Sequence, residues 1–463
     1  MVNVPEHPSY ASFPVFRAVD TRRPTRLDRF LSLFADVRGG EGAGALLLFA
    51  NIFLLLSAYY FLKTAREPLI LTEQGAVIKT YLSAGQAILL IFVIPLYSWL
   101  ASRLRRVWLL SGISVFFAAN LAAFYASAAA GTRIGIPFYL WVGIFNVFAI
   151  SQFWAFANDL YTEPQGKRLF PLIGVGASIG AVAGARAAGG AVARLGVLPL
   201  LLAGAALLLV CALLSVLADR RISSQAGAAQ LLARQQPLRP GDGFLLLFQD
   251  RYLVMIAFLV LLLNVVNTSG EFLISSLVTE QAARIAGAGP EFEEARRRFI
   301  GAFFGDYFFW VNTLSFFFQA FLVARLFRYI GVGGTLFILP VIAFSGYTLL
   351  LAAPVLGVIR LLKIVENSAD YSIQNTARQA LFLPTAREVK YKAKAAIDTF
   401  FQRAGDVTQA GIVYAGTNFL SLGIQGFALL NLILTGVWLV LVMYLAREYR
   451  LRSRSAAAPA PSA

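Results

Sequence analysis

Apolar runs of about 20 residues recur along this chain and alternate with short polar stretches. A helix needs a run of this length to cross the hydrocarbon core of a bilayer. Six runs precede a polar stretch at 218–249 and six follow it, which predicts an all-α polytopic membrane protein with twelve transmembrane helices in two six-helix halves, 43–217 and 250–446. The expected spans are 43–62, 77–100, 107–129, 134–158, 172–193, 197–217, 252–277, 299–322, 332–351, 355–378, 395–416 and 420–445.

The basic residues mark one side of the predicted membrane. Cytoplasmic loops carry an excess of Lys and Arg. If the N-terminal tail, 1–42, is cytoplasmic, the loops that return to the cytoplasm should be basic, and they carry residues such as Arg103, Lys167 and Arg325. We therefore expect both tails, 1–42 and 447–463, to be cytoplasmic and the chain to lie in a bacterial inner membrane. This topology, rather than nucleic-acid binding, explains the formal charge of +16.

Composition narrows the function further. The chain is 58% hydrophobic and 14% charged, with a mean hydropathy of +0.70, which excludes an ordinary soluble domain. Its only cysteine is Cys211 and its only histidine is His7. The chain therefore lacks the residues that would form a zinc site, a Cys/His dyad or a Ser-His-Asp triad. We expect no enzyme, no cofactor and no bound metal.

Ionisable residues interrupt the apolar runs near the C-terminus, from 360 to 406. On a regular helix, the run 355–378 places five polar side chains on one face, with Glu366 at its margin. The five are Lys363, Asn367, Asp370, Gln374 and Arg378. Each intramembrane charge costs about 2.5–3.5 kcal/mol unless it faces another charge or a water-filled cavity. Interhelical salt bridges and a substrate or ion pathway are both compatible with this pattern, and we favour the pathway.

Two further groups of charges lie in or beside the apolar runs. Lys63, Arg66 and Glu67 follow the first run, where they could form an ordinary interfacial anchor or a functional cluster. Glu271 is the lone acid of the run 252–277. It could line a cavity or pair with a basic residue of the first or eleventh run.

Glycines at four-residue spacing occupy the fifth run, at Gly176, Gly180 and Gly184. A glycine-rich stretch can cradle phosphate, but that turn follows a β-strand, and no strand is expected here. The spacing is typical of close helix packing in membranes, which is the favoured interpretation.

A weak internal repeat links the two halves. The loop after the second run contains Arg103, and the loop after the eighth run contains Arg325 in a similar Leu-x-x-Arg-Leu-x-Arg setting. Both loops resemble the basic motif that major facilitator proteins carry at these places. The two arginines are therefore candidates for gating.

Several separate motifs resemble one family. They are the cluster from Lys63 to Glu67, the fourth-run ending 153–158 with the Lys-Arg-Leu-Phe-Pro sequence beyond it, Glu271, and the Lys-rich stretch 392–398. Together they are similar to the ATP/ADP translocases of plastids and intracellular bacteria and their wider bacterial relatives. Those proteins are twelve-helix nucleotide exchangers related to the major facilitators. Thr64 and Val142 depart from the pattern where acids are expected.

The resemblance implies that Arg66, Glu271 and Lys394 contact the substrate, and the positions of the other charges extend this set. The full set of candidate substrate-binding residues is Lys63, Arg66, Glu67, Asn158, Glu271, Lys363, Asp370, Arg378, Lys392 and Lys394. The coupling or gating candidates are Glu366, Asp398, Arg103 and Arg325.

Three functions stay open on the sequence. The first is an antiporter of nucleotides or another phosphorylated anion that works by alternating access. The second is a proton-coupled facilitator for another solute, with Glu271, Glu366 and Asp370 carrying protons. The third is a membrane scaffold or receptor whose inner charges pair one to one and leave no cavity. The expected partners are a small anion and the lipid bilayer, without nucleic acid, and the default is a monomer.

Overall fold

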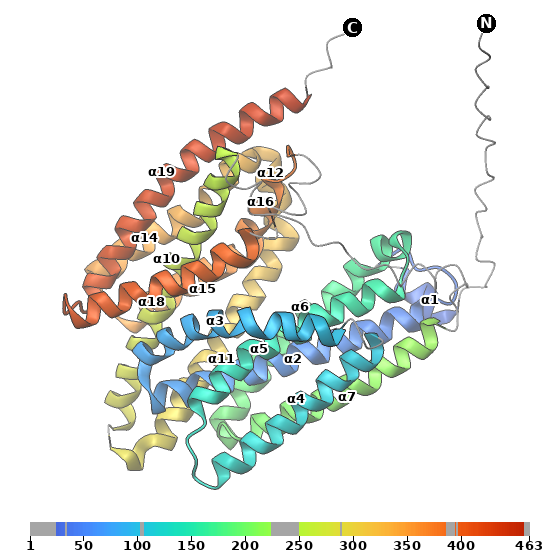
Figure 1. The fold of residues 1–463 in the computed structure, drawn as a ribbon, viewed down its shortest axis with the longest axis horizontal. Coiled ribbons are helices and arrows are strands. Elements are labelled where there is room, and N and C mark those ends of the chain that lie inside the picture. The colour runs from blue at the N-terminus through green and yellow to red at the C-terminus, as the bar shows by residue number, and fades with distance from the viewer. Residues whose placement is uncertain are drawn as a thin grey trace, which may run out of the picture.

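The structure, a computed structural model, describes residues 25–32, 35–101, 106–223, 250–287, 289–385, 394 and 397–457. Every regular element in these ranges is a helix (Figure 1). Arg103 and Lys392, both named from the sequence, lie outside the described residues.

The first bundle holds the six long helices of the N-terminal part. They are α2 (Gly42–Glu73), α3 (Gly75–Ala101), α4 (Arg106–Ala129), α5 (Gly135–Leu160), α6 (Glu163–Leu195) and α7 (Pro199–Ser223). A short helix, α1 (Arg26–Leu31), precedes them. It begins with a capping box, in which the Thr25 hydroxyl accepts from the Asp28 backbone N–H and the Asp28 carboxylate accepts from the Thr25 backbone N–H.

The second bundle contains more, and shorter, elements. They are α10 (Arg251–Ala286), η1 (Pro290–Phe292), α11 (Glu293–Phe317), η2 (Phe318–Leu322), α12 (Val323–Tyr329), α13 (Gly331–Thr335), α14 (Ile338–Ala352), α15 (Leu356–Ala369), η3 (Asp370–Gln374), α16 (Asn375–Ala380), η4 (Ile397–Phe401), α18 (Gln402–Asn418) and α19 (Ile424–Ala457).

Ten helices in the described residues are long and apolar enough to cross a membrane. They correspond to ten of the twelve predicted runs. The other two runs correspond to the helical stretches 356–380 and 397–418, whose polar residues lower their hydropathy. The chain is thus an all-α polytopic membrane protein, and the count of twelve membrane-spanning helices stays a prediction.

Among the described residues, three π-helical segments interrupt the second bundle, at η2, η3 and η4. A π segment adds a residue to one turn and rotates everything that follows it. The single polar face predicted from Lys363 to Arg378 is therefore wrong as a continuous stripe. Lys363 and Asn367 lie before η3, Gln374 is buried within it, and Arg378 follows it on a rotated face.

Helix α2 ends eleven residues beyond the predicted span 43–62, because it continues through Pro68 to Glu73. Lys63, Arg66 and Glu67 consequently lie within the helix, two to three turns before its end. Glu67 is buried, with 1% of its surface exposed. A buried carboxylate does not fit an anchor that faces the headgroups, so the burial of Glu67 favours the functional-cluster interpretation.

Close approach of α6 to α2 explains the glycines of α6. A Cβ atom added at Gly180 would lie 2.3 Å from the Phe53 carbonyl oxygen, and one at Gly184 would lie 2.6 Å from the Cα of Ser57. Gly176 has a similar contact of 2.8 Å with α2. The helix-packing interpretation of this spacing is confirmed, because only glycine leaves room for the facing backbone.

One end of the molecule, here called the terminal end, carries α1 and the C-terminal turns of α19. At this end Arg168 of α6 pairs with Glu41 at 2.8 Å, and Arg452 of α19 pairs with Asp250 at 2.7 Å. Burial alone would raise the pKa of the Asp250 carboxyl, but hydrogen bonds from Arg452 and the Tyr252 backbone N–H hold it below its ordinary value.

The pKa of Glu41 is also held below its ordinary value. Burial acts against this shift, and the hydrogen bonds from Arg168 and the Arg38 backbone N–H outweigh it. Glu41 and Asp250 precede α2 and α10, the first long helix of each bundle. The ion pairs with Arg168 and Arg452 therefore connect the start of each of these helices to a helix distant in sequence.

The two bundles diverge toward the terminal end and meet toward the opposite one, here called the far end (Figure 1). Helix α11 packs against α6 and α2, and α3 packs against α18 and α10. The backbones of α6 and α11 nearly touch, because a Cβ atom added at Gly305 would lie 2.3 Å from the Cα of Gly189. Near the end of α2, Glu73 pairs across the bundles with Arg297 at 3.2 Å.

Candidate functional site

A cavity of about 220 Å³ lies between the two bundles. Its walls come from α2, α3 and α5 on one side and from α10, α11, α18 and the η3 segment on the other. Four of the sequence candidates line it together, namely Lys63, Arg66, Glu67 and Glu271. These residues come from helices that are far apart in sequence, so the fold assembles the site.

Three charged groups of the first bundle form a chain along one wall. The Glu67 carboxylate pairs with Arg66 at 2.5 Å and with Lys79 of α3 at 2.6 Å. The Lys79 ammonium also donates to the Ser275 hydroxyl of the second bundle at 2.8 Å. One buried acid thus holds two cations in place, and the group as a whole keeps a positive charge.

Lys63 differs from these cations because its ammonium has no carboxylate within 4 Å among the described residues. It lies 4.3 Å from the centre of the Phe308 ring of α11 and within 6 Å of the rings of Tyr59 and Tyr60. A cation over aromatic faces is stabilised by the ring quadrupole and keeps its N–H donors available. Lys63 therefore supplies a positive charge that the protein itself does not neutralise with a direct ion pair.

The acid on the opposite wall is fixed by neutral donors. Glu271 of α10 accepts a hydrogen bond from the Asn367 amide at 2.9 Å and one from the Tyr307 hydroxyl at 3.2 Å. Asn367 belongs to α15 and Tyr307 to α11, so three helices of the second bundle meet at this carboxylate. Neutral partners leave its negative charge in place.

Aromatic rings complete the cavity. The Arg66 guanidinium lies 4.6 Å from the centre of the Tyr139 ring. Tyr371, in η3, also lines the cavity and is 44% exposed. Rings of this kind stack on planar groups and on cations.

A buried ion pair lies directly behind the cavity in the second bundle. Lys363 is completely buried and lies 3.3 Å from Glu366. Its ammonium also donates to the Asn267 side-chain oxygen at 2.6 Å, and Asn267 lines the cavity. The Tyr347 hydroxyl donates to Glu366 at 3.4 Å. Lys363 and Glu366 therefore contact the central cavity only through another residue.

The structure does not bring the remaining candidates into the cavity. Asn158 borders a separate hollow at the terminal end, beside Tyr161 and Lys167. Asp370 precedes the cavity residue Tyr371 but does not line the cavity. Arg325 is exposed and donates to the Phe321 carbonyl of the same helical stretch.

The Lys-rich entrance to α18 is described only in part. Arg378 lies 3.9 Å from Asp398, which is a long ion pair between the last two polar stretches of the chain. Lys394 is partly buried, with its ammonium 6.0 Å from the centre of the Phe382 ring. Neither Arg378 nor Lys394 lines the central cavity.

Lys79, Tyr139 and Gln409 are among the cavity residues that were not in the predicted set. Lys79 was visible as a lone lysine in an apolar run, which is itself a functional signal. Tyr139 and Gln409 carried no such signal, because a tyrosine or glutamine in a membrane helix is common. The Gln409 side chain is 2% exposed, and its amide nitrogen has no hydrogen-bond partner in the described part of the chain.

Parts of the chain are similar in sequence to known transporters. Residues 308–449 match the family model of the TLC ATP/ADP transporters. Over these residues the chain is similar to the ATP/ADP transporter family. It is 26% identical over 370 residues to ADP,ATP carrier protein 1 of Chlamydia muridarum, covering 68% of this chain and 66% of that protein. It is 25% identical over 354 residues to the Chlamydia trachomatis protein of the same name, covering 65% and 63%. The chain thus spans just under two thirds of these relatives.

Solved structures share the fold of this chain. The nucleoside transporter NupG aligns with a TM-score of 0.60 and 14% identity, over 89% of this chain and 99% of that one. A bacterial homologue of the human lysosomal transporter Spinster, in an inward-facing state, aligns with a TM-score of 0.55 and 14% identity, over 92% and 100%. The major facilitator-like architecture expected from the sequence is confirmed.

Proposed function

We propose that this chain is a transporter that exchanges nucleotides, of the ATP/ADP type, or a related phosphorylated anion by alternating access. The observation that carries the proposal is the cavity between the bundles, which holds Lys63, Arg66 and Lys79 against aromatic rings. The family match supports the same substrate class. No catalytic step is proposed.

The chemistry of the cavity suits the two parts of a nucleotide. Phosphate oxygens need several cationic donors, and the Lys63 ammonium has N–H groups available to donate to them. The Tyr139 and Tyr371 rings offer faces on which a base can stack. A typical small-molecule site measures about 300–1,000 Å³, so a cavity of about 220 Å³ holds only part of a nucleotide in this conformation.

Alternating access would require the cross-bundle contacts to break. Besides Lys79–Ser275, the Tyr60 hydroxyl donates to the Asn312 side chain across the bundles at 2.8 Å, and Arg297 reaches Glu73. Glu73 lies about two turns beyond the cavity residue Glu67 toward the far end. Tyr60 adjoins the cavity residue Tyr59, and Lys79 lines the cavity itself. We infer that the three contacts form the closed gate of this conformation and that the substrate enters from the terminal end.

The location follows from the same proposal. We place the chain in the bacterial inner membrane with both termini cytoplasmic, the first bundle at 43–217 and the second at 250–446. The terminal end is then the cytoplasmic side. We propose that one chain is the functional unit, because residues of one chain line the cavity.

A second candidate is proton-coupled transport of another solute. The observation that favours it is the Lys363–Glu366 pair, since a completely buried ion pair beside a cavity is a common place for a coupling proton. A scaffold without transport is disfavoured, because it predicts paired charges and no cavity.

The test is uptake of labelled ATP and ADP into proteoliposomes preloaded with ATP, ADP, phosphate or nothing, with and without a pH gradient. We expect uptake that requires internal nucleotide and is lost in Arg66→Gln. Arg298→Gln is the matched control, because Arg298 forms an exposed pair with Glu294 on α11. Uptake driven by a pH gradient alone, and abolished by Glu366→Gln, would favour the second candidate. Folded protein that takes up no nucleotide under any gradient would refute exchange.

A further inference from the structure

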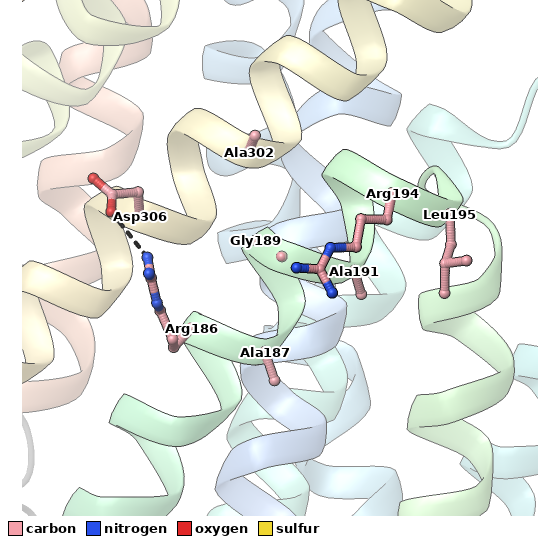
Figure 2. A pocket seen from close by; sticks show the side chains of 9 residues that line it. Arg186, Ala187, Gly189, Ala191, Arg194, Leu195, Ala302 and Asp306 are labelled. Carbon is pink, nitrogen blue, oxygen red and sulfur yellow. Dashed lines mark ion pairs between the residues drawn. The ribbon is translucent and has the colours of Figure 1, made fainter.

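A second, larger cavity lies on the side of the molecule, where α6 and α11 meet. It measures about 730 Å³ and is lined by residues of these two helices alone, including Arg186, Arg194 and Asp306 (Figure 2). We call it the lateral cavity. None of its lining residues lines the central cavity.

The lateral cavity opens on a membrane-facing surface. Its α6 residues belong to the candidate membrane span 164–195. The side chain of Arg186 is 69% exposed, whereas Ala185 and Ala188 on the opposite face of the same helix are completely buried. A transmembrane helix that buries one face in the bundle turns the other toward lipid.

Positive charge exceeds negative charge around the lateral cavity. Asp306 faces Arg186 with one carboxylate oxygen, at 3.6 Å, and pairs with Arg360 of α15 through the other. Arg194 has no carboxylate within 4 Å in the described part of the chain. Three arginines therefore share one aspartate, which leaves two positive charges for an anionic partner to balance.

Aromatic rings hold two of these arginines in place. The Arg186 guanidinium lies 5.4 Å from the centre of the Phe309 ring, and the Arg360 guanidinium lies 5.4 Å from that of Phe303. Long helical side chains lean toward the N-terminus of their helix, so Arg194 leans back toward Arg186. The two residues are about 12 Å apart along the axis of α6. Figure 2 shows the Arg194 guanidinium lying back along the turn at Gly189 and Ala191.

We propose that the lateral cavity binds the phosphate headgroup of an anionic phospholipid. Arg194, in the last turn of α6, lies at headgroup level, and Arg186 lies deeper, where its charge needs a partner. Basic pockets between transmembrane helices bind anionic headgroups in this way. Because Arg186 belongs to the first bundle while Asp306 and Arg360 belong to the second, the bound lipid contacts the joint between the bundles.

Small residues give the cavity its depth and provide a test that spares the charges. A Cβ atom added at Gly190 meets nothing within 4 Å, whereas one at Gly189 lies 3.2 Å from Gly305. Gly190→Phe therefore fills the cavity from its open side, keeps every arginine and leaves the contact between α6 and α11 intact.

The experiment measures retention of phosphatidylglycerol by the purified full chain in mixed micelles, by native mass spectrometry. Phosphatidylcholine, inorganic phosphate and ATP are the comparison ligands. We expect phosphatidylglycerol to be retained in preference to phosphatidylcholine and not to be displaced by inorganic phosphate or ATP. Each arginine contributes about fivefold near a membrane surface, so Arg186→Gln/Arg194→Gln should weaken retention on the order of 30-fold.

Gly190→Phe should also lose the lipid, while Arg298→Gln should retain it. Equal retention of phosphatidylcholine, or unchanged retention in the double variant and Gly190→Phe, would overturn the proposal. Displacement by phosphate or ATP would overturn it in favour of a soluble anion. The readout is binding of lipid rather than transport, so it does not depend on the proposed function.

Discussion

The central and lateral cavities both place cations at the joint between the bundles, but they compensate the charges differently. In the central cavity the acid Glu67 is buried and pairs with two cations at 2.5 and 2.6 Å. In the lateral cavity Asp306 is 32% exposed, and the arginines around it outnumber it. The central charges come from long helices that cross the middle of the molecule, and the lateral charges lie on its lipid-facing side.

This difference shows how burial sets the role of a membrane charge. A buried cluster has to be held together by its own acid, because removing one member leaves a charge without solvent or partner. An exposed cluster can recruit its counter-charge from the bilayer. The central cavity is therefore pre-organised for a soluble anion, and the lateral cavity is completed by lipid.

The largest expected difference concerns stability. Glu67→Gln leaves Arg66 and Lys79 without their buried acid and should lower the free energy of unfolding by about 3–5 kcal/mol. Asp306→Asn removes the acid of the exposed cluster and should lower the free energy of unfolding less, because the exposed arginines can recruit another counter-charge. Thermal unfolding of both variants in detergent provides the comparison. Equal shifts in the two variants would show that burial does not distinguish the clusters.

An effect of intermediate size is expected at Lys63, the cavity cation that has no carboxylate partner among the described residues. Lys63→Gln removes a charged donor to substrate, worth about 1.5–3 kcal/mol, and should lower nucleotide uptake by at least about tenfold. The Lys63→Gln variant should retain phosphatidylglycerol as well as the unchanged chain does, because Lys63 lines only the central cavity. Uptake within twofold of the unchanged chain would remove Lys63 from the site.

The smallest effect concerns the ion pair at the terminal end. The pKa of Asp250 is lowered in the folded chain, so its stabilisation is present above its unfolded pKa of about 3.9 and is lost as pH falls through the lower folded value. Asp250→Asn should cost no more than about 1 kcal/mol at pH 7 and nothing at a pH well below 3. Unfolding temperatures at the two pH values test this, and a cost that persists in acid would point to packing instead.

Much of the fold could be predicted from the sequence, because membrane spans are long and their composition is distinctive. Ten of the expected runs are found as candidate spans, and the packing role of Gly176, Gly180 and Gly184 is confirmed. The end of the first span was missed, because Lys63 and Arg66 resemble charges at a membrane interface, whereas they line the cavity between the bundles. Hydropathy cannot distinguish the two cases.

The site could be predicted only in part. Lys63, Arg66, Glu67 and Glu271 meet in one cavity, as a pathway requires. Helical periodicity failed beyond Asp370, because a π segment that no sequence pattern announces rotates the chain there. Tyr139 and Gln409 reach the cavity through the packing of helices, which spacing along one helix does not reveal.

The most direct test of the central claim is to ask whether nucleotide occupies the cavity between the bundles. The chain has a single cysteine, Cys211, which is buried, so an introduced thiol can report alone. Ser83 lines the cavity, and Ser127 lies exposed near the end of α4. We would measure the maleimide labelling rate of Ser83→Cys and Ser127→Cys with and without ATP or ADP. The account predicts that nucleotide slows labelling at position 83 alone. Labelling at 83 that saturating nucleotide leaves unchanged, in protein that still unfolds cooperatively, would contradict it.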